Sequence, residues 1–198
     1  MSDEAHFHLS GYVNKQNCRF WGTENPRICH EEPLHSLKVT VWCGVYAGKL
    51  ISPYFFQDDV GNTVNVNRAM VNEFLLPQLD ELGLENMWFQ QDGATTHTAI
   101  DLLKQAFPGR LISRFGDIHF SARSPDLTVL DFFLRGFLKS RVSVNRPQTL
   151  DALKENICQE GENLSVDVLK KVMENALKSA QHCIDAGGGH LLDIIFAN

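Results

Sequence analysis

Two extended segments joined by a two-residue turn constrain the fold more than any other feature of this sequence. Residues 38–46 (KVTVWCGVY) and 49–56 (KLISPYFF) are rich in β-branched and aromatic residues, which favour strands. Ala47-Gly48 between them is typical of a tight turn. The sequence therefore predicts a β-hairpin, which other elements of the chain must cover.

Helical and strand patterns alternate after this hairpin. Apolar residues recur at helical spacing over residues 65–82, with an interruption at Pro77. Further helices are expected over about residues 95–107, from Ser124-Pro125 to Pro147, and over about 148–160 and 165–184. Short strands are expected at residues 87–89 and 111–112, and loose alternation favours one more within residues 6–21. This order predicts an α/β fold, a mixed sheet flanked by helices.

Three aspartates stand where a metal site would draw its ligands. Asp92 follows an apolar strand in the run Gln90-Gln91-Asp92-Gly93-Ala94, Asp131 lies just inside a predicted helix, and Asp3 stands near the N-terminus. Carboxylates at the ends of regular elements can converge on two hard cations, an arrangement that suits phosphodiester chemistry. The alternatives are an Asp-Gly turn for Asp92 and a frayed terminal acid for Asp3.

Charge is distributed unevenly along the chain. The net charge is −6, yet residues 104–146 carry eight Lys or Arg against three Asp or Glu and bracket Asp131. A basic band beside an acidic metal site fits a phosphate backbone. A solvated helix face is the alternative for each of these basic residues.

The cysteines and the hydropathy exclude other classes. The five cysteines are scattered and never form a C-x-x-C pair, so reduced thiols are expected rather than a disulfide framework or a zinc site. No stretch approaches the roughly 20 apolar residues that cross a bilayer. The acidic N-terminus lacks an apolar signal segment. We therefore expect an intracellular protein without a membrane segment.

Several motifs in order resemble the catalytic domain of mariner-type transposases, within the DDE/D superfamily and its ribonuclease-H-like fold. They are DEAHFH at 3–8, VNKQN at 13–17, VWCGV at 41–45, QDGA at 91–94, HTA at 97–99, SPDL at 124–127, GGH at 188–190 and IIF at 194–196. Each motif alone is weak, but their order and spacing extend over nearly the whole chain. The resemblance implies one catalytic domain over residues 1–198.

The resemblance also implies a site and an activity. Asp3, Asp92 and Asp131 would be the catalytic triad and would bind two Mg²⁺ or Mn²⁺ ions. The chain would act as an endonuclease and strand transferase on transposon-end and target DNA, in the nucleus, with a homodimer allowed. Asp126 is the alternative to Asp131, but it fits first-turn charge at the helix start instead.

Four further side chains are candidates for contact with DNA: His97, Arg123, Arg135 and Lys139. A guanidinium fork binds phosphate bidentately, which makes Arg123 a candidate, with an unpartnered surface arginine as the alternative. His97 follows Asp92 on the next predicted helix, where helix capping or packing is the alternative. Arg135 and Lys139 belong to the basic band.

The sequence departs from the family pattern at several points. We expect the helix-turn-helix region that recognises transposon ends in relatives to be absent, and the first core strand, expected just before Asp3, to be largely missing. Val129 replaces a proline and Arg135 an aromatic residue. We therefore expect an N-terminally truncated copy. The alternatives are an inactive or domesticated remnant that binds nucleic acid or protein, and a ribonuclease-type hydrolase with the same fold.

Overall fold

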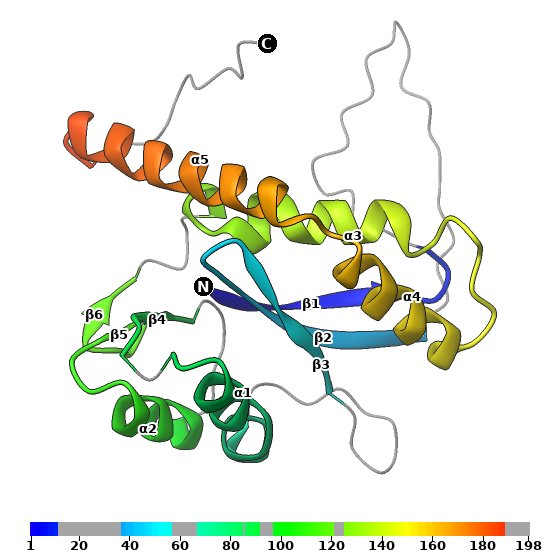
Figure 1. The fold of residues 1–198 in the computed structure, drawn as a ribbon, viewed down its shortest axis with the longest axis horizontal. Helices are drawn as coiled ribbons and strands as arrows, with labels where there is room; N and C mark the ends of the chain where they lie inside the picture. The colour runs from blue at the N-terminus through cyan, green and yellow to red at the C-terminus, as the bar shows by residue number, and fades with distance from the viewer. Residues whose placement is uncertain (12–36, 57–66, 85, 92–96, 121–124, 189–198) are drawn as a thin grey trace, which may run out of the picture.

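The predicted hairpin lies within the central sheet of the computed structural model (Figure 1), which describes residues 1–11, 37–56, 67–84, 86–91, 97–120 and 125–188. β2 (Lys38–Tyr46) and β3 (Lys49–Phe56) pair antiparallel. Both turn residues have positive φ, 42° at Ala47 and 80° at Gly48, as two-residue hairpin turns require. The hairpin prediction is confirmed.

β1 (Ser2–His8) pairs antiparallel with β2 along its whole length, and Asp3 lies opposite Cys43. The prediction that the first core strand is largely missing is therefore wrong, because Asp3 lies inside that strand instead of after it. The polar run Ser2-Asp3-Glu4 shows no apolar alternation, yet its backbone groups pair with β2. Residues 12–36, which include most of the loosely alternating segment, lie outside the described residues.

A second set of strands runs parallel: β4 (Phe89–Gln90), β5 (Leu111–Ser113) and β6 (Ile118–His119). A parallel bridge between Ser2 and Gln91 places β4 beside β1. The strands therefore follow the order β3-β2-β1-β4-β5-β6. The short strands β4 and β5 were predicted, whereas β6 was not, since its two exposed residues give no apolar pattern.

Helices occupy the regions where they are predicted, although the helix predicted from Ser124-Pro125 to Pro147 ends at Arg141. They are η1 (Met70–Leu75), α1 (Leu76–Glu81), α2 (His97–Ala106), η2 (Pro125–Leu127), η3 (Leu130–Leu134), α3 (Arg135–Arg141), α4 (Leu150–Glu162) and α5 (Val166–Asp185). The π-helical segment η1 passes directly into α1, so the chain stays helical through Pro77, where an interruption is predicted. Pro77 stands in the first turn of α1, where a missing N–H is tolerated.

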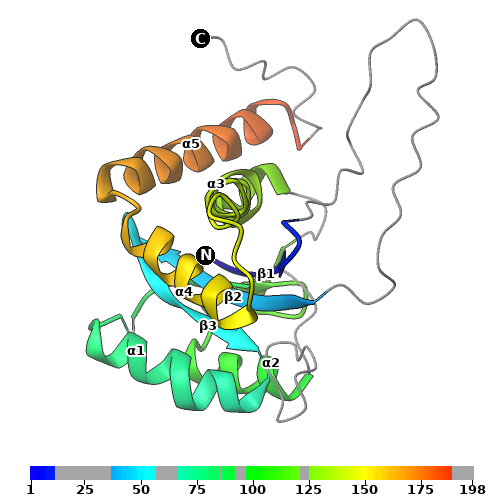
Figure 2. The same ribbon diagram turned by 90° about the vertical axis from the view of Figure 1, so that its right-hand side faces the viewer.

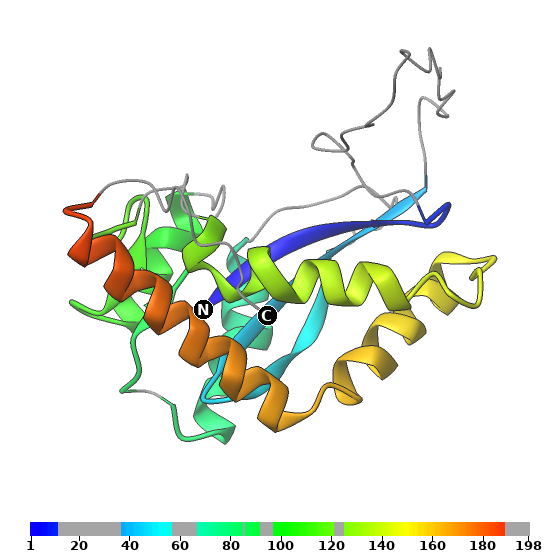
Figure 3. The same cartoon turned by 90° about the horizontal axis from the view of Figure 1, so that it is seen from above.

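Alternation along β2 creates a core on each face of the sheet. Val41, Cys43 and Val45 belong to the core with α3, α4 and α5, whereas Trp42 belongs to the core with η1, α1 and α2. Figure 2 shows the resulting layers, with the sheet between the two groups of helices. Seen from above, α3, α4 and α5 lie across one face of the strands (Figure 3).

The remaining expectations concern thiols and membranes. Cys43, Cys158 and Cys183 are free thiols, and Cys18 and Cys29 lie outside the described residues. In the part of the chain that the structure describes, every helix is too short or too polar to span a bilayer.

Candidate active site

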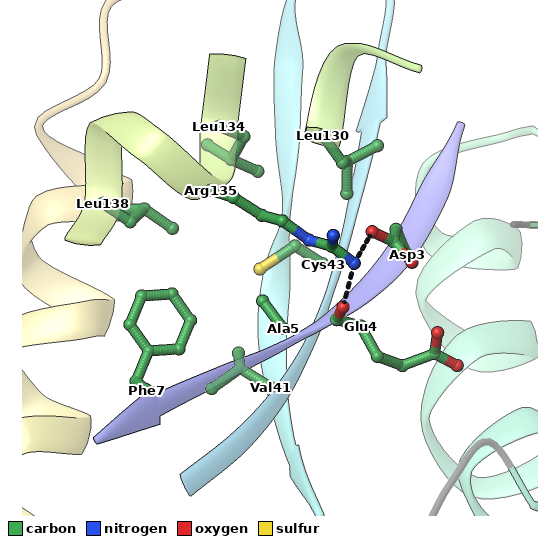
Figure 4. Close-up of a pocket in the computed structure, with 10 residues that line it drawn as sticks. All are labelled: Asp3, Glu4, Ala5, Phe7, Val41, Cys43, Leu130, Leu134, Arg135 and Leu138. Atoms are coloured by element: carbon green, nitrogen blue, oxygen red, sulfur yellow. Dashed lines mark hydrogen bonds and ion pairs between the residues drawn. The ribbon is translucent and has the colours of Figure 1, made fainter. Parts of the chain in front are cut away.

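Asp3 is a buried carboxylate on a central strand. Only 6% of its surface is exposed, and β1 lies between β2 and β4. Its charge is compensated by Arg135, whose Nη2 forms an ion pair with Asp3 Oδ2. The same nitrogen donates a hydrogen bond to the backbone oxygen of Glu4 at 2.5 Å (Figure 4). A buried carboxylate needs such a partner, because desolvation of an unpaired charge is costly.

Asp131 reaches the same guanidinium from the helical side. It lies in the π-helical turn η3, and its Oδ1 accepts a hydrogen bond from Arg135 Nη1 at 2.5 Å. The Asp131 side chain is 15% exposed. Two carboxylates from distant parts of the sequence therefore meet at one cation. Single π-helical turns are frequent at functional sites.

Asp92 itself lies outside the described residues, but the strand that leads to it is firmly held. Gln91 is buried, and its Oε1 accepts a hydrogen bond from Trp42 Nε1 at 3.2 Å and lies 2.7 Å from Ser2 Oγ. Gln91 Nε2 donates to Glu4 Oε1 at 3.3 Å. The strand before Asp92 is thus fixed beside the strand that carries Asp3.

The alternative acid, Asp126, is in a different setting. It is exposed in the short 3₁₀ turn η2, whereas Asp131 shares a cation with Asp3.

The structure describes the side chains of two of the four candidates for DNA contact, Arg135 and Lys139, but not those of Arg123 and His97. Arg135 contacts Asp3 and Asp131, and Lys139 lies one helical turn further along α3, with its ammonium 6.0 Å from the centroid of the Phe7 ring. Burial lowers the pKa of Lys139, and the charge of Arg135 lowers it further. Arg123 lies outside the described residues. His97 is the first residue of α2, but its side chain is not among those described.

Other members of the basic band make contacts on the protein itself. The guanidinium of Arg141 lies 3.5 Å from Glu160 and 4.6 Å from the centroid of the Phe137 ring. That of Arg114 lies 5.2 Å from the centroid of the Phe115 ring. Part of the predicted positive charge is therefore engaged in surface packing.

A small pocket opens beside Arg135 between β1, β2 and the η3–α3 helix (Figure 4). Most of the side chains that line it are apolar: Ala5, Phe7, Val41, Cys43, Leu130, Leu134 and Leu138. Burial raises the pKa of Cys43 to about 12, and the negative charge of Asp3 adds to the shift. On this side Asp3 has little solvation, which makes its ion pair with Arg135 important.

The chemistry of Asp3 and Asp131 fits a hard divalent cation, because carboxylate oxygens are the ligands that Mg²⁺ and Mn²⁺ prefer. Within the described ranges no three His, Cys, Asp or Glu side chains are grouped to hold a metal ion. The third predicted ligand, Asp92, falls outside those ranges. Asp3 and Asp131 thus have the chemistry of ligands for such a cation, and the metal-binding triad stays a prediction.

The sequence pointed to the acids but not to what surrounds them. Ser2, Glu4 and Gln91 were not identified as site residues, although Gln91 stands next to Asp92 in the motif. Arg135 was expected to contact DNA. The sequence did contain a signal for the ion pair between Arg135 and Asp131. The two residues are four positions apart, and opposite charges at that spacing pair on a helix.

Solved structures of the Mos1 transposase are similar to this fold. The Mos1 paired-end complex with left transposon end superposes with a TM-score of 0.66 at 16% identity, covering 96% of this chain and 55% of that chain. The Mos1 Strand Transfer Complex gives 0.66 at 15% identity, covering 96% and 54%. The Mos1 catalytic domain with raltegravir and Mn gives 0.58 at 14% identity, covering 78% of each chain.

Sequence comparison adds nothing to this, since no protein-family model and no curated protein matches the chain. The chain spans about half the length of the Mos1 chain in the DNA complexes. At such low identity the similarity establishes the fold alone. The predicted ribonuclease-H-like α/β fold is confirmed, and it is the fold of the catalytic domain of the mariner transposase Mos1.

Proposed function

We propose that residues 1–198 are the catalytic domain of a mariner-type transposase, which cuts and rejoins DNA at transposon ends. The observation that carries this proposal is the meeting of Asp3 and Asp131 at one cation, beside the strand that leads to Asp92. The fold supports it, because the similar Mos1 structures include a complex with a transposon end. Action on chromosomal DNA would require a nuclear location.

The proposed chemistry uses divalent metal held by Asp3, Asp92 and Asp131, and the Mos1 structures that contain Mn support this cofactor class. Two bound Mg²⁺ or Mn²⁺ ions would supply activation of a water or 3′-hydroxyl and stabilisation of the leaving oxygen. The protein's part is to hold the carboxylates on rigid elements. Asp3 sits on a central strand and Asp131 on a helix packed against it, which fixes their approach.

Contacts with the DNA backbone would come from the basic residues near this site. Lys139 follows Arg135 by one helical turn, and Arg123 precedes the helix that carries Asp131. Cationic side chains at these places would neutralise phosphates, and binding should weaken as salt increases. His97 is proposed to approach the same backbone from the start of α2.

The test is cleavage of supercoiled plasmid by the purified chain with Mn²⁺ or Mg²⁺. Nicking is expected, and Asp3→Asn, Asp92→Asn and Asp131→Asn should each abolish it. Asp126→Asn is the matched control, because this exposed carboxylate lies close to Asp131 in sequence but apart from the ion pairs. Absence of nicking with either metal, or nicking that survives Asp131→Asn, would refute the proposal.

One observation favours a second candidate, a catalytically silent domain that binds nucleic acid or protein. The guanidinium of Arg135 already compensates Asp3 and Asp131, so the protein does not need a metal to fold around them. This candidate predicts salt-dependent DNA binding in a mobility-shift assay without nicking at any Mn²⁺ concentration.

A further inference from the structure

We propose that Arg135 is an internal cation that competes with metal for Asp3 and Asp131, so that metal binding must displace its guanidinium. This inference rests on the proposed function, since it takes these carboxylates as the metal ligands. It adds a role for Arg135 that is opposite to that of a DNA contact, because it places the residue between the acids in the metal-free protein.

The contacts of Arg135 use the oxygens that a metal would need. Nη1 binds Asp131 Oδ1 at 2.5 Å, and Nη2 binds Asp3 Oδ2. A third contact, from Nη2 to the backbone oxygen of Glu4 at 2.5 Å, holds the guanidinium in this position (Figure 4). A divalent cation on the same oxygens would stand within a few ångströms of a fixed positive charge, and the two would repel each other strongly.

The burial of Asp3 explains why the guanidinium stays in the absence of metal. Asp3 is 6% exposed beside an apolar pocket, and removal of the partner of a buried charge is strongly destabilising. Arg135 therefore supplies, in the metal-free protein, the charge compensation that a metal would otherwise provide.

The position of Arg135 also allows it to leave. Its side chain is 36% exposed, so rotation about its own side-chain bonds can carry the guanidinium into solvent while the continuous helix formed by η3 and α3 stays folded. Asp3 and Asp131 remain on their own elements when it leaves. Release of Arg135 is thus a side-chain movement, which makes the competition reversible.

The decisive measurement is the affinity of Arg135→Met for Mn²⁺. Binding is measured by electron paramagnetic resonance, which detects free Mn²⁺, and independently by the rise in melting temperature when Mn²⁺ is added. Methionine keeps an unbranched stem but removes the charge. Without metal the variant should melt at a lower temperature than the unmodified chain. Its Mn²⁺ dissociation constant should be at least about tenfold lower, and Mn²⁺ should raise its melting temperature more.

Lys139→Met is the matched control, since it removes one positive charge one turn further along the same helix, where the ammonium lies over the Phe7 ring. General electrostatics would strengthen Mn²⁺ binding in both variants. Direct competition predicts a change below about threefold for Lys139→Met, because the Lys139 ammonium lies over the Phe7 ring, one helical turn from the guanidinium, and not between the two carboxylates. An equal increase in Mn²⁺ affinity in Arg135→Met and Lys139→Met would overturn the inference.

The remaining outcomes are also decisive. The inference is overturned if Arg135→Met binds Mn²⁺ with the same affinity as the unmodified protein, or if neither of these two proteins binds Mn²⁺. Folding of the variant only when Mn²⁺ is present supports it. If Arg135→Met does not fold at all, Arg135→Lys decides, because an ammonium lacks the fork that spans both acids. Tighter Mn²⁺ binding supports the inference in that variant, and unchanged binding overturns it.

Plasmid nicking, scored separately, distinguishes this inference from the proposed function. Tighter Mn²⁺ binding by Arg135→Met without nicking keeps the competition and removes the endonuclease function. If the unmodified protein and Arg135→Met both nick plasmid and need the same Mn²⁺ concentration for half-maximal nicking, the proposed function is supported and the competition is refuted.

Discussion

Gln91→Met should lower the free energy of unfolding by about 2–4 kcal/mol, although methionine and glutamine have similar volumes. The amide of Gln91 is buried where β1, β2 and β4 meet. Loss of Oε1 leaves the Trp42 indole N–H, 3.2 Å away, without this acceptor in a place where Trp42 is 0% exposed. An unsatisfied buried donor costs about 1–3 kcal/mol, and each lost hydrogen bond about 1 kcal/mol. Ser2 adds less, since its hydroxyl also lies 2.8 Å from the backbone oxygen of Gln90.

Urea denaturation followed by far-UV circular dichroism measures this loss. At roughly 2–4 °C per kcal/mol for a chain of this size, the melting temperature should fall by about 4–16 °C. Gln181→Met is the control, because the amide of Gln181 is exposed on α5 and donates to Asp185 at 2.8 Å. Its effect should stay within about 0.5 kcal/mol.

A double-mutant cycle tests the reason for the loss. Trp42→Phe removes the indole donor, so Gln91→Met made in that background should cost about 1–2 kcal/mol less than in the unmodified chain. A single-variant loss below about 1 kcal/mol would show that the buried amide does not stabilise the junction of the strands. An equal loss in both backgrounds would show that the bond to Trp42 is not the cause.

Three further predictions concern the core. Leu153→Ala, at a fully buried position of α4, should cost about 2–5 kcal/mol in the same urea titration, and a loss below about 1 kcal/mol would contradict the packing. Cys43 should resist N-ethylmaleimide in the folded protein while the partly exposed Cys183 reacts, as peptide mass spectrometry can show, because burial raises the pKa of Cys43 to about 12. Its neutral thiol contributes stability that is complete below about pH 9 and is lost as the pH rises from 9 towards 12, since the unfolded thiol ionises first. Cys43→Ala should therefore lose less stability than the unmodified protein between pH 9 and pH 12. An equal loss in the two proteins would show that ionisation of Cys43 is not the cause.

The parts of the fold that could be predicted from sequence are those with a local signal. The hairpin limits follow from β-rich runs on both sides of Ala47-Gly48, and α4 and α5 follow from helical periodicity with side-chain caps at Thr149 and Ser165. β1 has no such signal at its start, because Ser2, Asp3 and Glu4 are polar. Their strand is specified by pairing with β2, far away in the sequence.

The candidate site was predictable only in part for the same reason. Asp131 and Arg135 are four residues apart on one helix, so their ion pair can be read from spacing. The approach of Asp3 to the same guanidinium depends on the order of strands and on the packing of η3 against β1, and neither leaves a pattern in the sequence. The resemblance to mariner transposases led us to expect that Asp3 and Asp131 approach each other, but it did not predict that the Arg135 guanidinium lies between them.

Gln91 links the stability of the sheet to the site, which gives its substitution a second, sharper consequence. Asp3 lies between Ser2 and Glu4, and Gln91 contacts both of these neighbours. Under the proposed function, Gln91→Met should therefore reduce the rise in melting temperature on addition of Mn²⁺, because the carboxylate of Asp3 is held less firmly. Leu153→Ala, whose side chain does not line the pocket beside Asp3, should lose comparable stability but keep the full Mn²⁺ response. If both variants respond to Mn²⁺ alike, then β1 keeps Asp3 in place through its pairing with β2, and the contacts of Gln91 do not determine the geometry of the site.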